Sequence, residues 1–232
     1  MSLYLILNIA SFIIPFLYSF EKRMQYSKRW KSLFPALLTT AVFFIIWDVL
    51  FTKMGVWHFN PRYHTGIEIL GLPIEEWLFF FCIPYASLFI HFAFQYFLPK
   101  VALSDVTVKR IYWGIVIVIF PVLIFNLDKW YTAVNYGFLL LLLTYTIRKT
   151  PTVLKTFFIT FLIILIPFAI VNGILTGSFI DEPVVYYNDA ENLGIRLVTI
   201  PIEDVGYAFS MLLMTLVLMY QSENKLKRNE TL

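Results

Sequence analysis

Charged residues and cysteine are both scarce in this sequence. Charged side chains make up 14% of the 232 residues, whereas 59% are hydrophobic and 19% are aromatic. A soluble domain of ordinary composition is excluded by that balance. The single cysteine, Cys82, excludes a disulfide framework and a metal cluster built on several thiolates.

Familiar cofactor fingerprints are missing as well. The sequence has no Gly-x-Gly-x-x-Gly segment, no phosphate-binding loop and no serine elbow, so a Rossmann-type flavin or nicotinamide site is not indicated. The three histidines, His58, His64 and His91, lack the spacing of zinc ligands. We therefore expect no cofactor and no metal. Nucleic acid is not expected as a partner either, because the basic residues fall in short loops.

Long apolar stretches dominate what is present. Windows of about 20 apolar residues match a bilayer core roughly 30 Å thick. They predict seven membrane spans at residues 3–20, 33–51, 73–97, 110–126, 130–147, 154–175 and 201–220. No basic region precedes the first stretch, so it is interpreted as a span and not as a signal peptide. The sequence thus predicts an all-α integral membrane protein with seven transmembrane helices in contact with the lipid bilayer.

The basic residues are distributed unevenly between the two sides of these spans. Most lysines and arginines follow spans one, three, five and seven, and only a few lie in the other loops. Basic loops remain in the cytoplasm. We predict an outer N-terminus and a cytoplasmic C-terminus in the cell (inner) membrane.

An internal repeat relates two distant segments. Residues 56–76 align without a gap to residues 184–204, with seven identities at an offset of 128. Gly66 and Gly194 are one of these identities and predict a repeated turn. Four spans separate the copies, so both have the same orientation and their acidic ends lie near the outer face. We predict two parallel three-helix repeats, residues 1–98 and 130–232, joined by a connecting helix in residues 99–129.

Each copy ends in a proline followed by two acids near the start of a span. Acids in the first turn of a helix are stabilised by its dipole, so one such pair could simply begin a helix well. Two copies leading into aromatic residues favour a functional site. If one of these acids is buried among the rings, loss of solvent raises its pKa and keeps it neutral, so that it can donate a proton, and a close carboxylate reinforces that shift. The candidate catalytic residues are Glu75, Glu76, Glu203 and Asp204.

Asp48 is unusual because it lies near the C-terminal end of span two, where the helix dipole disfavours an anion. It either pairs with Lys53 or Arg62 or faces a cleft with the acid pairs. Arg196 could hold a carboxylate ionised, and three asparagines could orient one. Nearby aromatic residues either form an interfacial belt or face a cation. The supporting candidates are Asp48, Trp57, Asn60, Tyr63, Phe79, Phe80, Asn172, Asn188, Arg196 and Tyr207.

Taken together, these motifs resemble the integral-membrane lycopene cyclase family. The resemblance covers the whole chain, with Val185 departing from the aromatic residue of the first copy. It is carried by residues 55–60, 72–80, 172–177, 187–188 and 200–204.

The resemblance implies a flavin-independent, acid-catalysed intramolecular lyase or isomerase. Lycopene end groups would be cyclised to β-ionone rings, giving γ-carotene and then β-carotene. Lycopene and the monocyclic carotenoid would be the substrates, and other carotenoid-pathway enzymes are candidate partners. The family's acidic motif maps onto Glu75, Glu76, Glu203 and Asp204, without indicating which is donor and which is base.

A proton- or cation-coupled membrane transporter is the alternative interpretation of the paired acids. Such a protein would place acids near the bilayer midplane on broken helices. Here they gather at one interface, which counts against that alternative.

Overall fold

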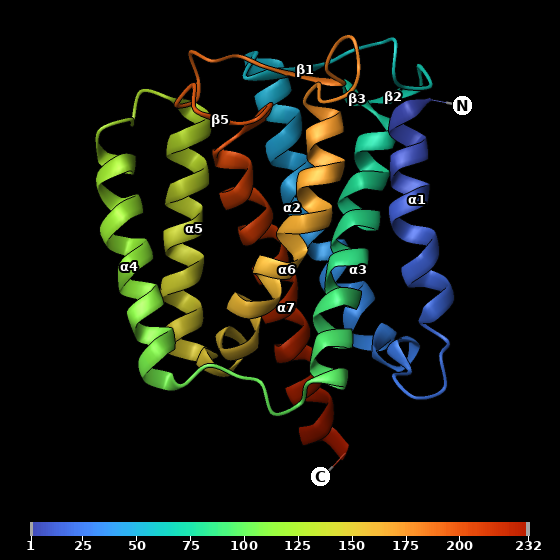
Figure 1. Ribbon diagram of the computed structural model, residues 1–232, viewed down its shortest axis with the longest axis vertical. Helices are drawn as coiled ribbons and strands as arrows, with labels where there is room; N and C mark the ends of the chain where they lie inside the picture. Colours follow the sequence, from blue (N-terminus) through green and yellow to red (C-terminus); the bar gives the residue numbers. More distant parts are fainter. Residues whose placement is uncertain (1, 231–232) are drawn as a thin grey trace.

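The fold is a bundle of helices whose long axes run side by side (Figure 1). The computed structural model describes residues 2–230, with side chains up to residue 225, so those of Lys227 and Arg228 lie outside the described residues. Within this range there are seven α-helices, α1 (Leu3–Tyr18), α2 (Trp30–Met54), α3 (Ile74–Phe97), α4 (Asp105–Ile124), α5 (Trp130–Lys149), α6 (Pro151–Leu175) and α7 (Glu203–Glu230). A short 3-10 helix, Tyr26–Arg29, precedes α2.

The helices identify a multi-pass membrane protein. Among the described residues, five helices are long and apolar enough to cross a bilayer: α2 with its preceding turn, α3, α4, α6 and α7. The helix α1 is apolar but has only 16 residues, and α5 is more polar. Large aliphatic side chains on the outer surfaces of the helices are exposed, for example Ile14 at 61%, Ile117 at 69% and Ile170 at 61%. Lipid tails are the natural environment for such a surface.

The predicted spans each overlap one helix, although their ends differ. For example, α4 begins at Asp105 rather than residue 110 because Ser104 caps it, its hydroxyl accepting from Thr107 N at 3.1 Å. The last helix begins at Glu203 and continues past residue 220, beyond the end of the predicted span. The helix leaves the bundle there (Figure 1), and the side chains of residues 221–225, which are polar, suit a segment outside it.

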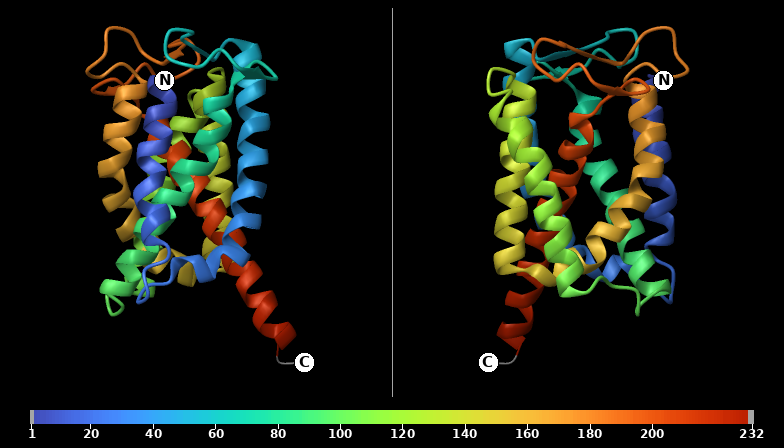
Figure 2. Two further views of the ribbon diagram at one scale, coloured as in Figure 1. Left: turned by 90° about the vertical axis from the view of Figure 1, so that its right-hand side faces the viewer. Right: turned by 60° about the vertical axis from the view of Figure 1, so that its left-hand side comes forward.

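The helix α7 lies at the centre of the bundle and packs against α2, α3, α5 and α6. The helix α1 packs on α3, and α4 packs mainly on α5 at the edge of the bundle (Figure 2). Fully buried apolar side chains such as Leu33, Leu143, Phe157 and Leu213 fill the interior. The central helix therefore presents side chains to both halves of the chain.

Short strands were not predicted from the sequence, but the loops at the N-terminal end of the bundle contain them (Figure 1). The strand β1 (Trp57–Phe59) pairs antiparallel with β4 (Val185–Tyr187), joining loops far apart in the chain. Two hairpins lead into α3 and α7, namely β2 (Glu68–Ile69) with β3 (Leu72–Pro73) and β5 (Arg196–Leu197) with β6 (Ile200–Pro201).

The two hairpins are preceded by matching glycine turns, as the aligned glycines predict. Gly66 has φ of 83° and Gly194 has φ of 69°, a left-handed conformation that glycine adopts without steric cost. At the hairpin tips, Leu70 and Val198 also have positive φ, 56° and 61°. Both long loops thus approach the start of the following helix in the same way.

Candidate active site

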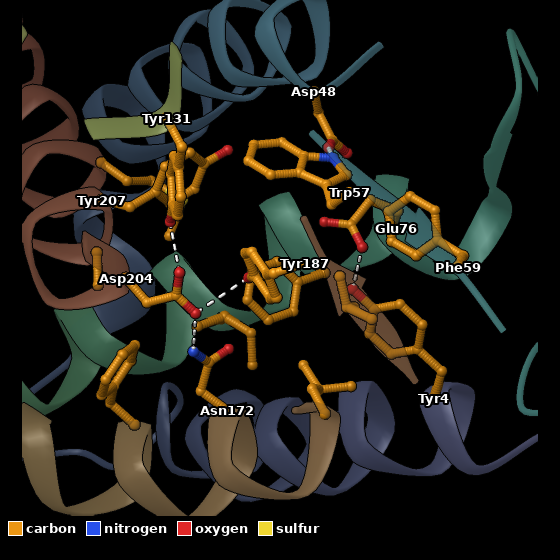
Figure 3. Close-up of a pocket in the computed structure, with 17 residues that line it drawn as sticks. Tyr4, Asp48, Trp57, Phe59, Glu76, Tyr131, Asn172, Tyr187, Asp204 and Tyr207 are labelled. Atoms are coloured by element: carbon orange, nitrogen blue, oxygen red, sulfur yellow. Dashed lines mark hydrogen bonds between the residues drawn. The ribbon is translucent and has the colours of Figure 1, made fainter. Parts of the chain in front are cut away.

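A chamber lies directly beneath the paired strands, and every helix except α4 contributes to its lining (Figure 3). It holds about 600 Å³ of space between atoms, its open mouth included. Three carboxyl groups face an otherwise largely apolar and aromatic wall. The lining residues are Tyr4, Asp48, Trp57, Phe59, Glu76, Phe79, Ile83, Tyr131, Phe168, Asn172, Leu175, Val185, Tyr187, Asp204, Tyr207, Ala208 and Met211.

Asp204 is surrounded by hydrogen-bond donors. Its Oδ1 accepts from the Tyr131 hydroxyl at 2.5 Å. Its Oδ2 accepts from Asn172 Nδ2 at 2.6 Å and from the Tyr187 hydroxyl at 3.0 Å. Three donors converging on one carboxyl group stabilise it as an anion although the residue is only 4% exposed.

Glu76 has a different environment on the other side of the chamber. Its Oε2 accepts a hydrogen bond from the Tyr4 hydroxyl, and its other oxygen points into the chamber (Figure 3). One donor compensates the charge on a buried carboxylate much less than three do. The surroundings of Glu76 therefore favour a neutral carboxylic acid, which can give up a proton.

Asp48 lies next to Glu76 in the chamber wall (Figure 3). Its Oδ1 accepts from the Trp57 indole Nε1 at 2.5 Å, while its Oδ2 is buried without a partner among the described atoms. The interpretation of Asp48 as an ion-pair partner of Lys53 or Arg62 is wrong, because neither pairs with it among the described residues and Arg62 pairs with the exposed Asp181 at 3.2 Å. Two neighbouring acids in an apolar wall cannot easily both be charged, so at least one proton is retained there.

Aromatic rings enclose the space between the acids. The Trp57 ring centroid lies 5.2 Å from that of Tyr131 and 5.9 Å from that of Tyr187, and Tyr207 lies 6.3 Å from Tyr131. Electron-rich ring faces attract positive charge, most strongly where water is excluded. The chamber can therefore stabilise a cationic intermediate without forming a bond to it.

Tyr187, in the strand β4 above the bundle, keeps its proton. Removal of water from around the phenol raises the pKa of Tyr187 well above its usual value, and the neighbouring Asp204 carboxylate raises it further. The hydroxyl is thus a permanent donor to Asp204.

The other acid of each motif points away from the chamber and fastens a loop. Glu75 Oε1 accepts from Ser2 Oγ and from Thr65 N, both at 2.7 Å. We call the bond from Thr65 N to Glu75, with the eleven-residue segment it closes, the first clasp.

Glu203 forms the second clasp in the same way. Its Oε1 accepts from Thr132 Oγ1 and from Leu193 N, both at 2.7 Å, and the segment from Leu193 to Glu203 again has eleven residues. Glu75 and Glu203 are both fully buried. Their contacts define a role in positioning the loops that cover the chamber.

Three hydrogen-bond donors of the chamber, Tyr4, Tyr131 and Tyr187, were absent from the predicted candidates. Tyr4 and Tyr131 bind Glu76 and Asp204, respectively. Four residues further along each helix, Asn8 donates to the Glu75 carbonyl at 2.8 Å and Asn135 donates to the Glu203 carbonyl at 2.6 Å. A Tyr-x-x-x-Asn spacing at an offset of 127 residues was the signal that could have revealed Tyr4 and Tyr131.

The structure brings only part of the predicted set together. Seven candidates line the chamber, namely Asp48, Trp57, Glu76, Phe79, Asn172, Asp204 and Tyr207. The remainder lie outside its lining, namely Glu75, Asn60, Tyr63, Phe80, Asn188, Arg196 and Glu203.

The outlying polar candidates hold loops in place. Asn60 Nδ2 donates to Glu182 at 3.0 Å, and Asn188 Nδ2 donates to the Gly55 carbonyl at 3.3 Å. Arg196 pairs with the exposed Asp189 at 2.5 Å and not with a chamber acid.

The outlying aromatic candidates pack around the chamber. Phe80 is buried and packs against Phe44, with ring centroids 6.3 Å apart. Tyr63 packs beside the cluster around Tyr4, and the Arg62 guanidinium lies 5.6 Å from its ring centroid. Neither ring reaches the chamber lining.

The fold and the chamber define a helical, multi-pass membrane protein with buried acids in a largely apolar, aromatic cavity. The chain belongs to the lycopene cyclase family, whose family model matches residues 1–94 and 128–221. Membership makes the protein an enzyme of the cyclase kind that acts on a carotenoid. Searches among curated proteins and among solved structures gave no significant match.

Proposed function

We propose that this protein is a lycopene β-cyclase that closes β-ionone rings by flavin-independent acid catalysis, as an isomerase of the intramolecular lyase type. The observation that carries the proposal is the unequal environment of two acids in one chamber. Asp204 accepts from three donors, whereas Glu76 accepts from one. Such a difference separates a proton donor from a base.

The reaction begins with Glu76 as the acid. Its proton adds to the terminal double bond of lycopene and leaves a tertiary carbocation. The next double bond attacks this cation, forming the ring carbon–carbon bond and moving the positive charge onto the ring. Ring faces of Trp57, Tyr131 and Tyr207 stabilise the charge, and exclusion of water prevents its capture as an alcohol.

Asp204 completes the reaction as the base. Its carboxylate removes a proton from the ring carbon next to the cation, and the ring double bond forms. Passage of that proton back to the Glu76 side restores the site, so the hydrocarbon gains and loses no atoms overall. The position of the base relative to the ring determines which proton leaves and hence whether the ring is of the β type.

Parallel repeats of three helices, residues 1–98 and 130–232 with 99–129 as connector, are part of the proposal. Matching clasps and matching Tyr-x-x-x-Asn contacts in the two halves support this arrangement, as do two matched segments of equal length. With all seven helices as spans, the distribution of basic residues favours a cell (inner) membrane location, with the chamber near the outer face.

Expression in a lycopene-accumulating bacterium tests the proposal. The wild-type protein is expected to convert red lycopene into γ-carotene and β-carotene, whereas Glu76→Gln and Asp204→Asn each lower conversion at least about 100-fold. Glu68→Gln, an exposed carboxylate on the same side of the bundle, serves as the matched control and stays active. Unchanged lycopene with well-inserted wild-type protein would refute the proposal, as would full activity in both acid variants.

A further inference from the structure

A second cavity continues from the chamber toward the middle of the bundle. The two cavities share six lining residues, Phe79, Ile83, Phe168, Asn172, Ala208 and Met211. The remaining lining is mostly aliphatic and consists of Ser11, Pro15, Ala86, Ser87, Ile90, Ile164, Pro167, Val171 and Leu212. Because the lining is shared, the second cavity adjoins the acid chamber on the side of the apolar interior.

This second cavity reaches the side of the bundle between α1 and α6. Ser11 and Pro15 of α1 and Pro167 and Val171 of α6 line it and are only partly buried. The two helices lie next to each other (Figure 2), yet each packs mainly on α3. Their surfaces beside the cavity carry exposed aliphatic side chains such as Ile14 and Ile170.

A proline stands on each side of the opening. Pro15 and Pro167 lie inside their helices, where proline removes one backbone hydrogen bond and its ring displaces the preceding turn. Sharp bends of helices occur at such prolines. Both helices beside the opening therefore have interrupted backbone hydrogen bonding at the cavity.

We propose that this cavity is a lateral channel that admits a carotenoid from the bilayer and holds its polyene chain while one end group occupies the acid chamber. The inference rests on the proposed function and deepens it. A C40 hydrocarbon is much longer than the chamber, so most of it must lie elsewhere. The second cavity offers an apolar path from the acids to lipid.

One chamber and one channel impose an order on the reaction. A single end group fits beside the acids at a time, because the chain behind it fills the channel. The half-cyclised product must withdraw into the bilayer and return with its other end before a second ring forms. Narrowing the channel therefore slows both ring closures while leaving the acids intact.

Graded substitution of Val171 by Leu, Phe and Trp tests the channel. Conversion of lycopene is expected to fall as the side chain grows, at least tenfold for Val171→Trp. The matched control is Val42→Trp, which places the same ring in a lipid-facing groove that shares no lining residue with the chamber. Thermal midpoints of the Val171 variants in detergent equal to that of the wild type confirm that they fold. A short acyclic isoprenoid with the same end group is expected to remain a substrate of Val171→Trp.

Binding supplies a second readout. The Asp204→Asn variant is expected to retain lycopene that co-purifies with it. The double variant Asp204→Asn and Val171→Trp is expected to bind none. Unchanged conversion and unchanged pigment in the Val171 series, with active wild type, would overturn the channel and leave the proposed function standing. Inactive wild type and inactive Val42→Trp would instead overturn the proposed function.

Discussion

The indole of Trp57 donates a hydrogen bond from Nε1 to Asp48 Oδ1 at 2.5 Å. It connects the strand β1, which covers the chamber, to the helix α2, which walls it. The bond also provides the only partner of a buried acid whose second oxygen has none among the described atoms. The loop that contains β1 thereby influences the charge state of the chamber.

Trp57→Phe keeps an aromatic wall but leaves Asp48 without its donor. An unsatisfied buried group costs about 1–3 kcal/mol, so we expect a lower thermal midpoint together with reduced lycopene conversion. Trp77→Phe is the matched control, because its Nε1 donates at 3.3 Å to a backbone carbonyl outside the chamber. Equal losses in the two variants would contradict a special role for the Trp57 bond.

Tyr131→Phe removes one of the three donors to Asp204. Hydrogen bonds to charged groups contribute about 1.5–3 kcal/mol, and we expect lycopene conversion to fall by roughly 10-fold or more. Initial rates in isolated membranes measure the effect. Tyr112→Phe loses a comparable hydroxyl contact, to Thr144 at 3.1 Å, and should retain the wild-type rate; a similar loss there would show that the effect is structural.

Gly206 allows a close approach between α5 and α7 directly after the second acid pair. A Cβ there would lie 3.1 Å from Tyr136 Cε1 and 3.2 Å from Leu139 Cδ1, so Gly206→Ala should lower stability and disturb Asp204. Gly137→Ala meets no atom within 4 Å and should be neutral or stabilising, by up to about 1 kcal/mol, since alanine favours helix. Thermal unfolding of the pair in detergent measures the difference, and the opposite ranking would contradict the packing.

Labelling of single cysteines tests the orientation in the membrane. Cys82 is buried and can be replaced by alanine, which leaves a background for Leu70→Cys at an exposed hairpin tip and Lys100→Cys in the opposite loop. A membrane-impermeant maleimide added to intact cells should label residue 70 and not residue 100. Labelling of residue 100 alone in intact cells would mean that the orientation is the reverse of the predicted one. In permeabilised cells both residues should be labelled.

Helix positions could be predicted because hydropathy acts over whole segments. Each predicted span overlaps a helix, and the aligned glycines foretold the matching turns at Gly66 and Gly194. The short strands were missed because the pairing of β1 with β4 depends on contacts 128 residues apart. Two- and three-residue strands leave no hydrophobic alternation to detect.

The choice between the acids of each pair could not be made from sequence. Consecutive residues on a helix point about 100° apart, so only the direction of the helix relative to its neighbours determines which acid meets the chamber. The structure orients Glu76 and Asp204 inward and Glu75 and Glu203 toward the loops. Tyr4 and Tyr131 were overlooked because two residues in an apolar helix do not stand out until their acceptors are known.

The two clasps limit where related chains can differ in loop length. Each fixes an eleven-residue segment between a backbone N–H and a carboxylate, from Thr65 to Glu75 and from Leu193 to Glu203. An insertion or deletion inside either segment would break the contact or rotate the next acid out of the cavity. Length variation in these loops should therefore be confined to the stretches before Thr65 and before Leu193.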